Sequence, residues 1–185
     1  MKELSLNILD ITENSVKAGA HLTVIELTED DERLTVTITD DGCGMTAEVL
    51  RGVEDPFYTT RTTRKVGMGI PLLKMAAEQT GGSFKIVSKH EDEYPTEHGT
   101  SVTAQFFKNH LDFTPIGDIP ATLATLIQGH PDTDFQLCHK YGENEVSLDT
   151  REMRVMLEGI PLNSYEVIKW AEDYLREQYD SLYKQ

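Results

Sequence analysis

A strict alternation of apolar and polar residues runs through residues 34–40, LTVTITD. A period of two is typical of a strand that buries one face and exposes the other. By that period Asp40 shares a face with Leu34, Val36 and Ile38, which is the face a strand buries. A carboxylate on the core side costs free energy unless it has a partner. The sequence therefore predicts a half-buried sheet with a polar site where this strand ends.

Helical and strand patterns follow one another along the first part of the chain. An amphipathic pattern predicts a helix over residues 4–18, and a strand at 22–27 precedes the strand at 34–40. A short helix from 46 to about 52, a loop, a helix over 68–80 and a hairpin with strands 83–89 and 99–107 come next. One α/β layer pair is complete by about Lys108.

A Pro-punctuated stretch, DFTPIGDIP, separates this part from residues 111–185, which carry 14 acidic and 6 basic residues. Helices near 119–129 and 150–158, strands near 134–140 and 145–148 and a final helix predict a small α+β domain. We therefore divide the chain into domains 1–108 and 111–185. The final helix carries Trp170, Tyr174, Tyr179 and Tyr183, residue types favoured at interfaces. We expect it to dock a partner or form a homodimer, and the alternative is that these aromatics pack the small domain against the first one.

The net charge of −15 and the pI near 4.7 restrict the partners of this chain. Such a surface repels phosphates, which excludes direct nucleic-acid binding. No stretch approaches 18 apolar residues, and Glu3, Asp10 and Glu13 interrupt any signal-peptide core, so we expect a cytoplasmic protein without a membrane partner. Cys43 and Cys138 lack zinc-site spacing and are expected to be reduced thiols.

A D-x-G-x-G pattern, made by Asp40, Gly42 and Gly44, follows the alternating strand directly. Glycines allow a positive φ and a close ligand, and a buried carboxylate can accept a hydrogen bond from an exocyclic amine. The alternative interpretation is a tight strand-to-helix turn with an Asp cap.

A second glycine pair, Gly67 and Gly69, stands immediately before a predicted helix. Free backbone N–H groups and the helix dipole suit phosphate oxygens there. Arg61, Arg64 and Lys65 precede the pair and form the densest basic cluster of an acidic chain. An ordinary solvated loop is the alternative interpretation.

Three polar residues of the first helix, Asp10, Asn14 and Lys17, lie at i, i+4 and i+7 and so on one face. Carboxylate and amide oxygens suit Mg²⁺, which takes one or two protein oxygens and completes its shell with phosphates and water. The alternative is a polar stripe that faces solvent.

The segments NILDITENSVKAGA, DDGCGM, EDPFYTTRTTRKVGMGIPLL, GGSFKIVSK and GTSV occur in this order over about residues 4–107. In order and spacing they resemble the N, G1, F and G2 boxes and the terminal Gly-Thr of the GHKL superfamily of gyrase, heat-shock chaperone, histidine kinase and mismatch-repair ATPases. The resemblance implies a Bergerat fold, a two-layer α/β sandwich with helices on one face of a mixed, mostly antiparallel sheet. It also implies ATP and Mg²⁺ as cofactors.

Carried over by position, the resemblance assigns a role to individual residues. Asn14 would coordinate Mg²⁺ on the ATP phosphates, Asp40 would accept the adenine amino group, and Thr100 would approach the base through water. Gly42 and Gly44 would shape the adenine pocket, and Gly67 and Gly69 would meet the phosphates. The full predicted ATP-binding set is Asn14, Lys17, Asp40, Gly42, Gly44, Met45, Arg61, Arg64, Lys65, Gly67, Met68, Gly69, Ile70 and Thr100.

Two positions depart from the family pattern. Asp10 stands where the ATPase branches have a Glu general base and most histidine kinases an Asn, and Lys65 replaces a customary glycine. Fewer than ten residues precede Asp10, so the phosphoacceptor hairpin of a histidine kinase is expected to be missing. We therefore expect Mg²⁺-dependent ATP binding by a histidine-kinase-like protein that passes phosphate or a signal to a separate protein. The alternatives are an ATPase switch with Asp10 as catalytic base and a non-catalytic nucleotide sensor or anti-sigma-like module.

Overall fold

The computed structural model describes residues 3–53 and 68–184 of the chain. In chain order the described elements are α1 (Leu4–Lys17), β1 (Leu22–Glu29), β2 (Arg33–Asp40), α2 (Ala47–Val53), α3 (Gly69–Gln79), β3 (Ser83–Lys89), β4 (Gly99–Phe107), α4 (Ile119–Gly129), β5 (Asp134–Tyr141), β6 (Asn144–Asp149), α5 (Thr150–Leu157) and α6 (Tyr165–Leu182). Within these ranges no helix combines the length and the apolar character needed to cross a lipid bilayer.

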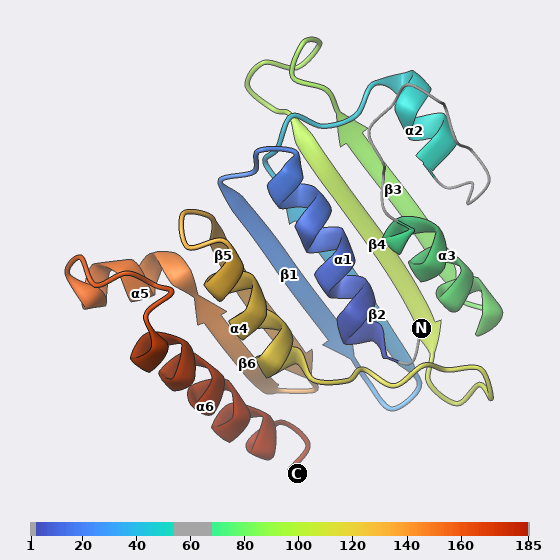
Figure 1. Cartoon of the computed structure of the whole chain (residues 1–185). Helices are drawn as coiled ribbons and strands as arrows, with labels where there is room; N and C mark the ends of the chain where they lie inside the picture. Colours follow the sequence, from blue (N-terminus) through green and yellow to red (C-terminus); the bar gives the residue numbers. More distant parts are fainter. Residues whose placement is uncertain (1–2, 54–67, 185) are drawn as a thin grey trace.

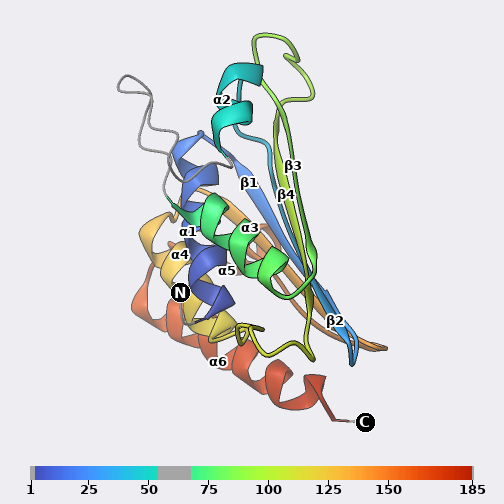
Figure 2. The same cartoon turned by 90° about the vertical axis from the view of Figure 1, so that its right-hand side faces the viewer.

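The strands form one six-stranded sheet in the order β3-β4-β2-β1-β5-β6 (Figure 1). All neighbouring pairs are antiparallel except β1 and β5, which run parallel. Helices α1, α3, α4 and α6 cover one face of the sheet, as the side view shows (Figure 2). This arrangement confirms the predicted two-layer sandwich with a mixed, mostly antiparallel sheet.

The two faces of the sheet follow directly from the period-two pattern of its strands. Leu34, Val36 and Ile38 of β2 point toward the helices and are buried. On the opposite face, Thr37 and Thr39 form hydrogen bonds across to Thr103 (3.3 Å) and Ser101 (2.9 Å) of β4. A face lined by hydroxyls needs no second layer, because its polar atoms pair across the strands and with water.

The sheet continues across the boundary that the sequence predicted near residue 110. β5 pairs with β1 over its whole length, from Leu22 opposite Asp134 to Glu29 opposite Tyr141. Helix α4 packs between α1 and α6 in the helix layer (Figure 1). This parallel pairing therefore joins strands from the two sides of the predicted boundary between 1–108 and 111–185. The two strands lie about a hundred residues apart in sequence, so no local pattern predicts that they pair.

Helix α6 covers the outer edge of β6. The side-chain amide of Gln178 accepts a hydrogen bond from the N–H of Ser147 and donates one to its carbonyl oxygen, both at 3.1 Å. Asn144, at the start of β6, donates to the carbonyl oxygens of Leu182 and Lys184. A side chain therefore satisfies the backbone groups that a further strand would otherwise pair with.

A buried ionic cluster lies where β1 ends. The side chain of Glu29 is 1% exposed and accepts hydrogen bonds from Tyr183 (2.6 Å) and Lys108 (2.8 Å), with His139 Nε2 at 3.1 Å. The hydroxyl of Tyr179 lies 3.0 Å from His139 Nδ1, on the other side of the same ring. Burial alone raises the pKa of Glu29, but the bonds from His139, Lys108 and Tyr183 outweigh it and lower the pKa to about 2. The cluster therefore joins β1, β5 and α6 through one ionised carboxylate.

The lowered pKa of Glu29 predicts a pH dependence of folding. A carboxylate with a lowered folded-state pKa stabilises the fold fully above its unfolded value of 4.5 and loses this contribution as the pH falls toward about 2. Urea unfolding of the wild type and of Glu29→Gln should show a free-energy difference that shrinks by roughly 3 kcal/mol between pH 5 and pH 2. Glu32→Gln, in the exposed turn after β1, is the control and should follow the wild type, and a pH-independent Glu29→Gln difference would contradict the assignment.

Candidate functional site

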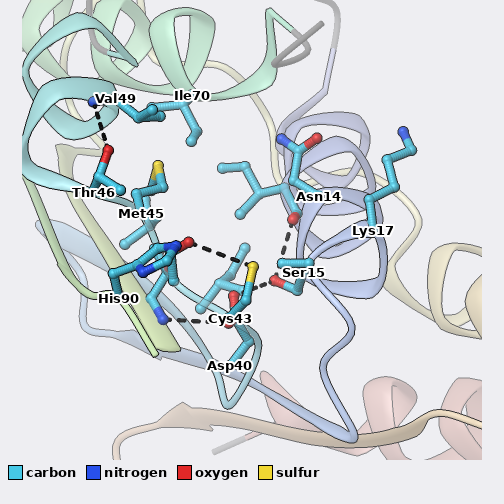
Figure 3. A pocket seen from close by; sticks show the side chains of 16 residues that line it. Asn14, Ser15, Lys17, Asp40, Cys43, Met45, Thr46, Val49, Ile70 and His90 are labelled. Carbon is cyan, nitrogen blue, oxygen red and sulfur yellow. Dashed lines mark hydrogen bonds between the residues drawn. The ribbon is translucent and has the colours of Figure 1, made fainter. Parts of the chain in front are cut away.

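A cavity of about 850 Å³ opens between α1, the end of β2, β4 and the segment that leads into α2 (Figure 3). Its wall combines side chains that the sequence singled out with others that it did not. The lining residues are Ile11, Asn14, Ser15, Lys17, Ala18, Ile38, Asp40, Cys43, Gly44, Met45, Thr46, Val49, Ile70, His90, Thr100 and Val102.

Asp40 lies at the floor of the cavity with its carboxylate held in place from three sides. Ser15 Oγ on α1 donates to Oδ2 at 2.6 Å, while the N–H groups of Gly42 and Thr100 donate to Oδ1 at 3.0 and 3.3 Å. The two acceptor oxygens have about four lone-pair sites between them, so acceptor capacity remains for a ligand. A carboxylate fixed in this way can bind a donor without first losing rotamer freedom.

The turn after Asp40 is pinned against the β3–β4 hairpin. Gly44 has φ +68°, and a Cβ there would lie 1.9 Å from the carbonyl oxygen of Lys89. Ser88 Oγ accepts from the N–H of Met45 at 2.7 Å and lies 2.8 Å from the hydroxyl of Thr100. Gly44 is therefore required by close backbone contact, and this contact fixes the position of Met45 in the cavity wall.

The rest of the wall is largely apolar. Ile38 and Val102, both buried, stand on neighbouring strands β2 and β4, and Ile70 comes from α3. Met45 and Val49 close the side toward α2 (Figure 3). Apolar walls around one oriented carboxylate suit a flat heterocycle that carries an amino group.

Asn14 brings an unsatisfied amide to the cavity from α1. Its Nδ2 is buried and has no hydrogen-bond partner among the described residues. Because the oxygen and nitrogen of an amide exchange places on rotation, this end of the side chain can offer either atom to a ligand. Lys17, one turn further along, is exposed and extends away from Asp40 (Figure 3).

Other predicted site residues lie outside the cavity wall. Gly42 is buried, and a Cβ added to it would lie only 2.9 Å from the Cβ of Ala18. A Cβ added to Gly69, which is also buried, would lie 2.8 Å from the Cβ of Asp10. Met68 is 60% exposed. Gly42 and Gly69 thus allow close packing, and Gly69 sets Asp10 beside the first turn of α3.

The predicted basic loop falls in the part of the chain that the structure does not describe. Arg61, Arg64, Lys65 and Gly67 all lie outside the described residues, so their predicted contacts remain predictions.

Nine of the lining residues were not placed in the site by the sequence analysis. Three of them are Ser15, Cys43 and His90. Ser15 falls one helical turn from Ile11, so its small size on the apolar stripe of α1 was an available signal. Cys43 is the second unspecified position of the D-x-G-x-G pattern. His90 follows β3, and no sequence pattern connects it with the site.

The family model described as histidine kinase-, DNA gyrase B-, and HSP90-like ATPase matches residues 2–110. Sporulation kinase E of Bacillus subtilis is 28% identical over 97 residues, which cover 52% of this chain and 12% of that protein. Sporulation kinase A of the same organism is 28% identical over 113 residues, covering 58% of this chain and 16% of that protein. The chain therefore spans less than a fifth of the length of these curated relatives.

Two solved structures share the fold at low sequence identity. The Aquifex aeolicus MutL ATPase domain complexed with ADP has a TM-score of 0.55 at 13% identity, over 85% of this chain and 70% of that chain. The N-terminal domain of a DNA repair protein has a TM-score of 0.53 at 15% identity, over 80% of this chain and 53% of that chain. Both likenesses cover more of the chain than the family model does, so they extend past residue 110. With its family model matched over more than half of its length, this chain belongs to the family of histidine kinase-, DNA gyrase B- and HSP90-like ATPases.

Proposed function

We propose that this chain binds ATP with Mg²⁺ in the cavity between α1, β2 and β4, and that it passes phosphate or a signal to a separate protein. The observation that carries the proposal is the carboxylate of Asp40, held by three donors at the floor of an apolar cavity. Family membership supports the nucleotide, and the names of the curated relatives, which are sporulation kinases, support phosphotransfer.

The chemistry of the cavity floor favours adenine over guanine. An adenine amino group can donate to Asp40, whereas the carbonyl oxygen that guanine carries at the same place would face a carboxylate and repel it. The apolar walls from Ile38, Val102 and Ile70 suit the two faces of a purine ring.

Asn14 is the residue we assign to the metal. Within residues 3–53 and 68–184 no three His, Cys, Asp or Glu side chains gather to hold an ion. Mg²⁺ does not need such a group, since one or two protein oxygens suffice when phosphates and water complete its octahedron. The buried, unsatisfied amide of Asn14 fits this role. The ion would neutralise phosphate charge, while Asn14 fixes where that charge lies.

Asp10 decides between the two reactions we consider. Its packing beside Gly69 places it at the first turn of α3, where helix N–H groups favour negative charge. This placement favours a second candidate function, hydrolysis, in which the Asp10 carboxylate accepts a proton from water. In phosphotransfer the attacking group belongs to the partner, and Asp10 only needs to leave room for it.

Replacing Asp40 by Asn tests the adenine contact. A hydrogen bond to a charged acceptor is worth about 1.5–3 kcal/mol and one to a neutral acceptor about 0.5–1.5 kcal/mol, so ATP affinity should fall by about tenfold. The preference for ATP over GTP should narrow as well, because Asn can donate to a guanine carbonyl. Calorimetry with both nucleotides measures this. Asp41→Asn, adjacent but outside the cavity, is the matched control, and an unchanged ATP/GTP ratio in Asp40→Asn would refute the assignment.

The metal role of Asn14 is tested by removing the ion. Asn14→Ala should weaken ATP binding in the presence of Mg²⁺ and leave the residual binding in excess EDTA close to that of the wild type, because only the metal-dependent part is lost. Asn7→Ala is a matched control, since Asn7 is also a buried α1 asparagine with an unsatisfied Nδ2 and does not line the cavity. Equal losses with and without the ion would make Asn14 a structural residue.

Labelled ATP distinguishes the reactions. Incubating the chain and lysate of its own organism with γ-labelled ATP should label a separate protein, and Asp10→Asn should preserve that label because the reaction does not need a base at this position. Steady release of labelled phosphate without a partner, abolished in Asp10→Asn, would identify an ATPase. ATP binding with neither product would identify a nucleotide sensor and contradict both reactions.

A further inference from the structure

The four aromatic side chains of the C-terminal helix divide into two groups. Tyr179 and Tyr183 join the buried cluster around Glu29 and His139. Trp170 and Tyr174 instead point outward, with exposed fractions of 49% and 40%. Of the four aromatics predicted to form an interface, Trp170 and Tyr174 are therefore the two that remain candidates.

Trp170 and Tyr174 form a stacked aromatic pair on the surface. Their ring centroids lie 5.0 Å apart and their planes differ by 11°. One helical turn separates them, so the helix itself holds the stack together. A pre-stacked pair loses little side-chain entropy on binding, and Trp and Tyr are the residue types that dominate binding energy at interfaces.

The flank of α6 that carries this pair is acidic. Glu166, Asp173 and Glu177 stand at four residues before, three after and seven after Trp170, so they share its side of the helix. All three are exposed, and none forms an ion pair with another described residue. Neighbouring Lys169 makes no ion pair with them either, whereas Glu172, on the other flank, pairs with Arg176. With Lys169 three residues after Glu166 and four before Asp173, this flank carries three negative charges and one positive charge, and so a net negative charge, around an aromatic surface.

We propose that this surface, the Trp170–Tyr174 stack with Glu166, Asp173 and Glu177, binds an arginine-bearing segment of a partner protein. A guanidinium group stacks on an aromatic face and donates in a fixed fork to a carboxylate, and it sheds water more readily than an ammonium group does. An arginine side chain can therefore contact the aromatic stack and the carboxylates at the same time. None of the five residues lines the nucleotide cavity, and α4 separates α6 from α1 in the helix layer (Figure 1). The inference therefore does not rest on the proposed function.

Trp170 is the single tryptophan of the chain, and its fluorescence therefore reports on this surface directly. The full-length protein is titrated with three peptides of equal length that alternate leucine with arginine, lysine or glutamate. The arginine peptide should shift the emission and bind at least twofold more tightly than the lysine peptide, and the glutamate peptide should not bind. Equal binding of the arginine and lysine peptides would overturn the choice of arginine.

Two variants separate the aromatic and the charged contributions. Tyr174→Ala should weaken the arginine peptide by roughly two- to fivefold, while Tyr165→Ala, 74% exposed and on the opposite flank of α6, should not. The triple variant Glu166→Gln, Asp173→Asn, Glu177→Gln should remove most of the salt dependence of binding. Its control is Glu91→Gln, Asp92→Asn, Glu93→Gln, an equal charge change between β3 and β4.

Three results would overturn the proposal. Tyr165→Ala could weaken binding as much as Tyr174→Ala does, or the control triple variant could remove the salt dependence equally. Alternatively, the emission could change with protein concentration alone, together with a dimer that Tyr174→Ala abolishes, in which case the occupant is a second copy of the chain. ATP affinity should stay unchanged in every α6 variant, which keeps this test distinct from that of the nucleotide site.

Discussion

The pairing of β1 on both of its edges is the constraint on which the rest of the structure depends. Antiparallel pairing with β2 holds one edge from Thr23 to Glu29, and parallel pairing with β5 holds the other from Leu22 to Glu29. Where β1 begins, the carboxylate of Asp41 accepts from the N–H groups of His21 and Leu22 and so ties the start of the D-x-G-x-G turn to this strand. Where β1 ends, Glu29 holds the ionic cluster. One strand therefore positions both the cavity beside Asp40 and the attachment of the C-terminal helix.

The cavity owes its shape to backbone contacts more than to large side chains. Asp40 is oriented by two backbone N–H groups and one small hydroxyl, and Gly44 and Gly99 bring three chain segments within contact of one another. Groups fixed in this way cannot relax around a ligand of another shape. The selectivity that we propose for the floor of the cavity therefore rests on a preorganised arrangement of the protein.

Local patterns predicted the parts of the structure that local physics determines. The alternation of residues 34–40 placed Asp40 on the helix-facing side of β2, and helical spacing brought Asn14 to the cavity. The same period-two rule also applies to Glu29, on the face of Ile25 and Leu27, but the predicted strand ended at residue 27 and left Glu29 outside it. The parallel β1–β5 pairing and the contact of His90 with the cavity depend on segments far apart in sequence. No pattern within a single window contains that information.

Helical spacing also explains why the sequence did not predict which aromatics of α6 are buried and which are exposed. The four aromatics were treated as one group in the sequence analysis, yet Leu175 lies on the buried side of the helix and Tyr174, the residue before it, on the exposed flank. Adjacent residues of a helix point about 100° apart. Because tyrosine and charged residues are mixed along the flanks of α6, the hydrophobic pattern does not define clearly which side of the helix is buried.

The amide of Gln178 on Ser147 has a consequence for how this molecule can associate. Together with helix α6, which covers the outer edge of β6, it blocks one border of the sheet, while no described strand pairs with the outer border of β3. A sheet open on both borders can add neighbours without limit and grow into a fibre, whereas one with a single open border can be extended only there. When two such molecules pair through their β3 strands, each occupies the open border of the other and no open border is left. Helix α6, held against β6 by this glutamine among other contacts, thus limits edge-to-edge pairing of these sheets to the β3 border.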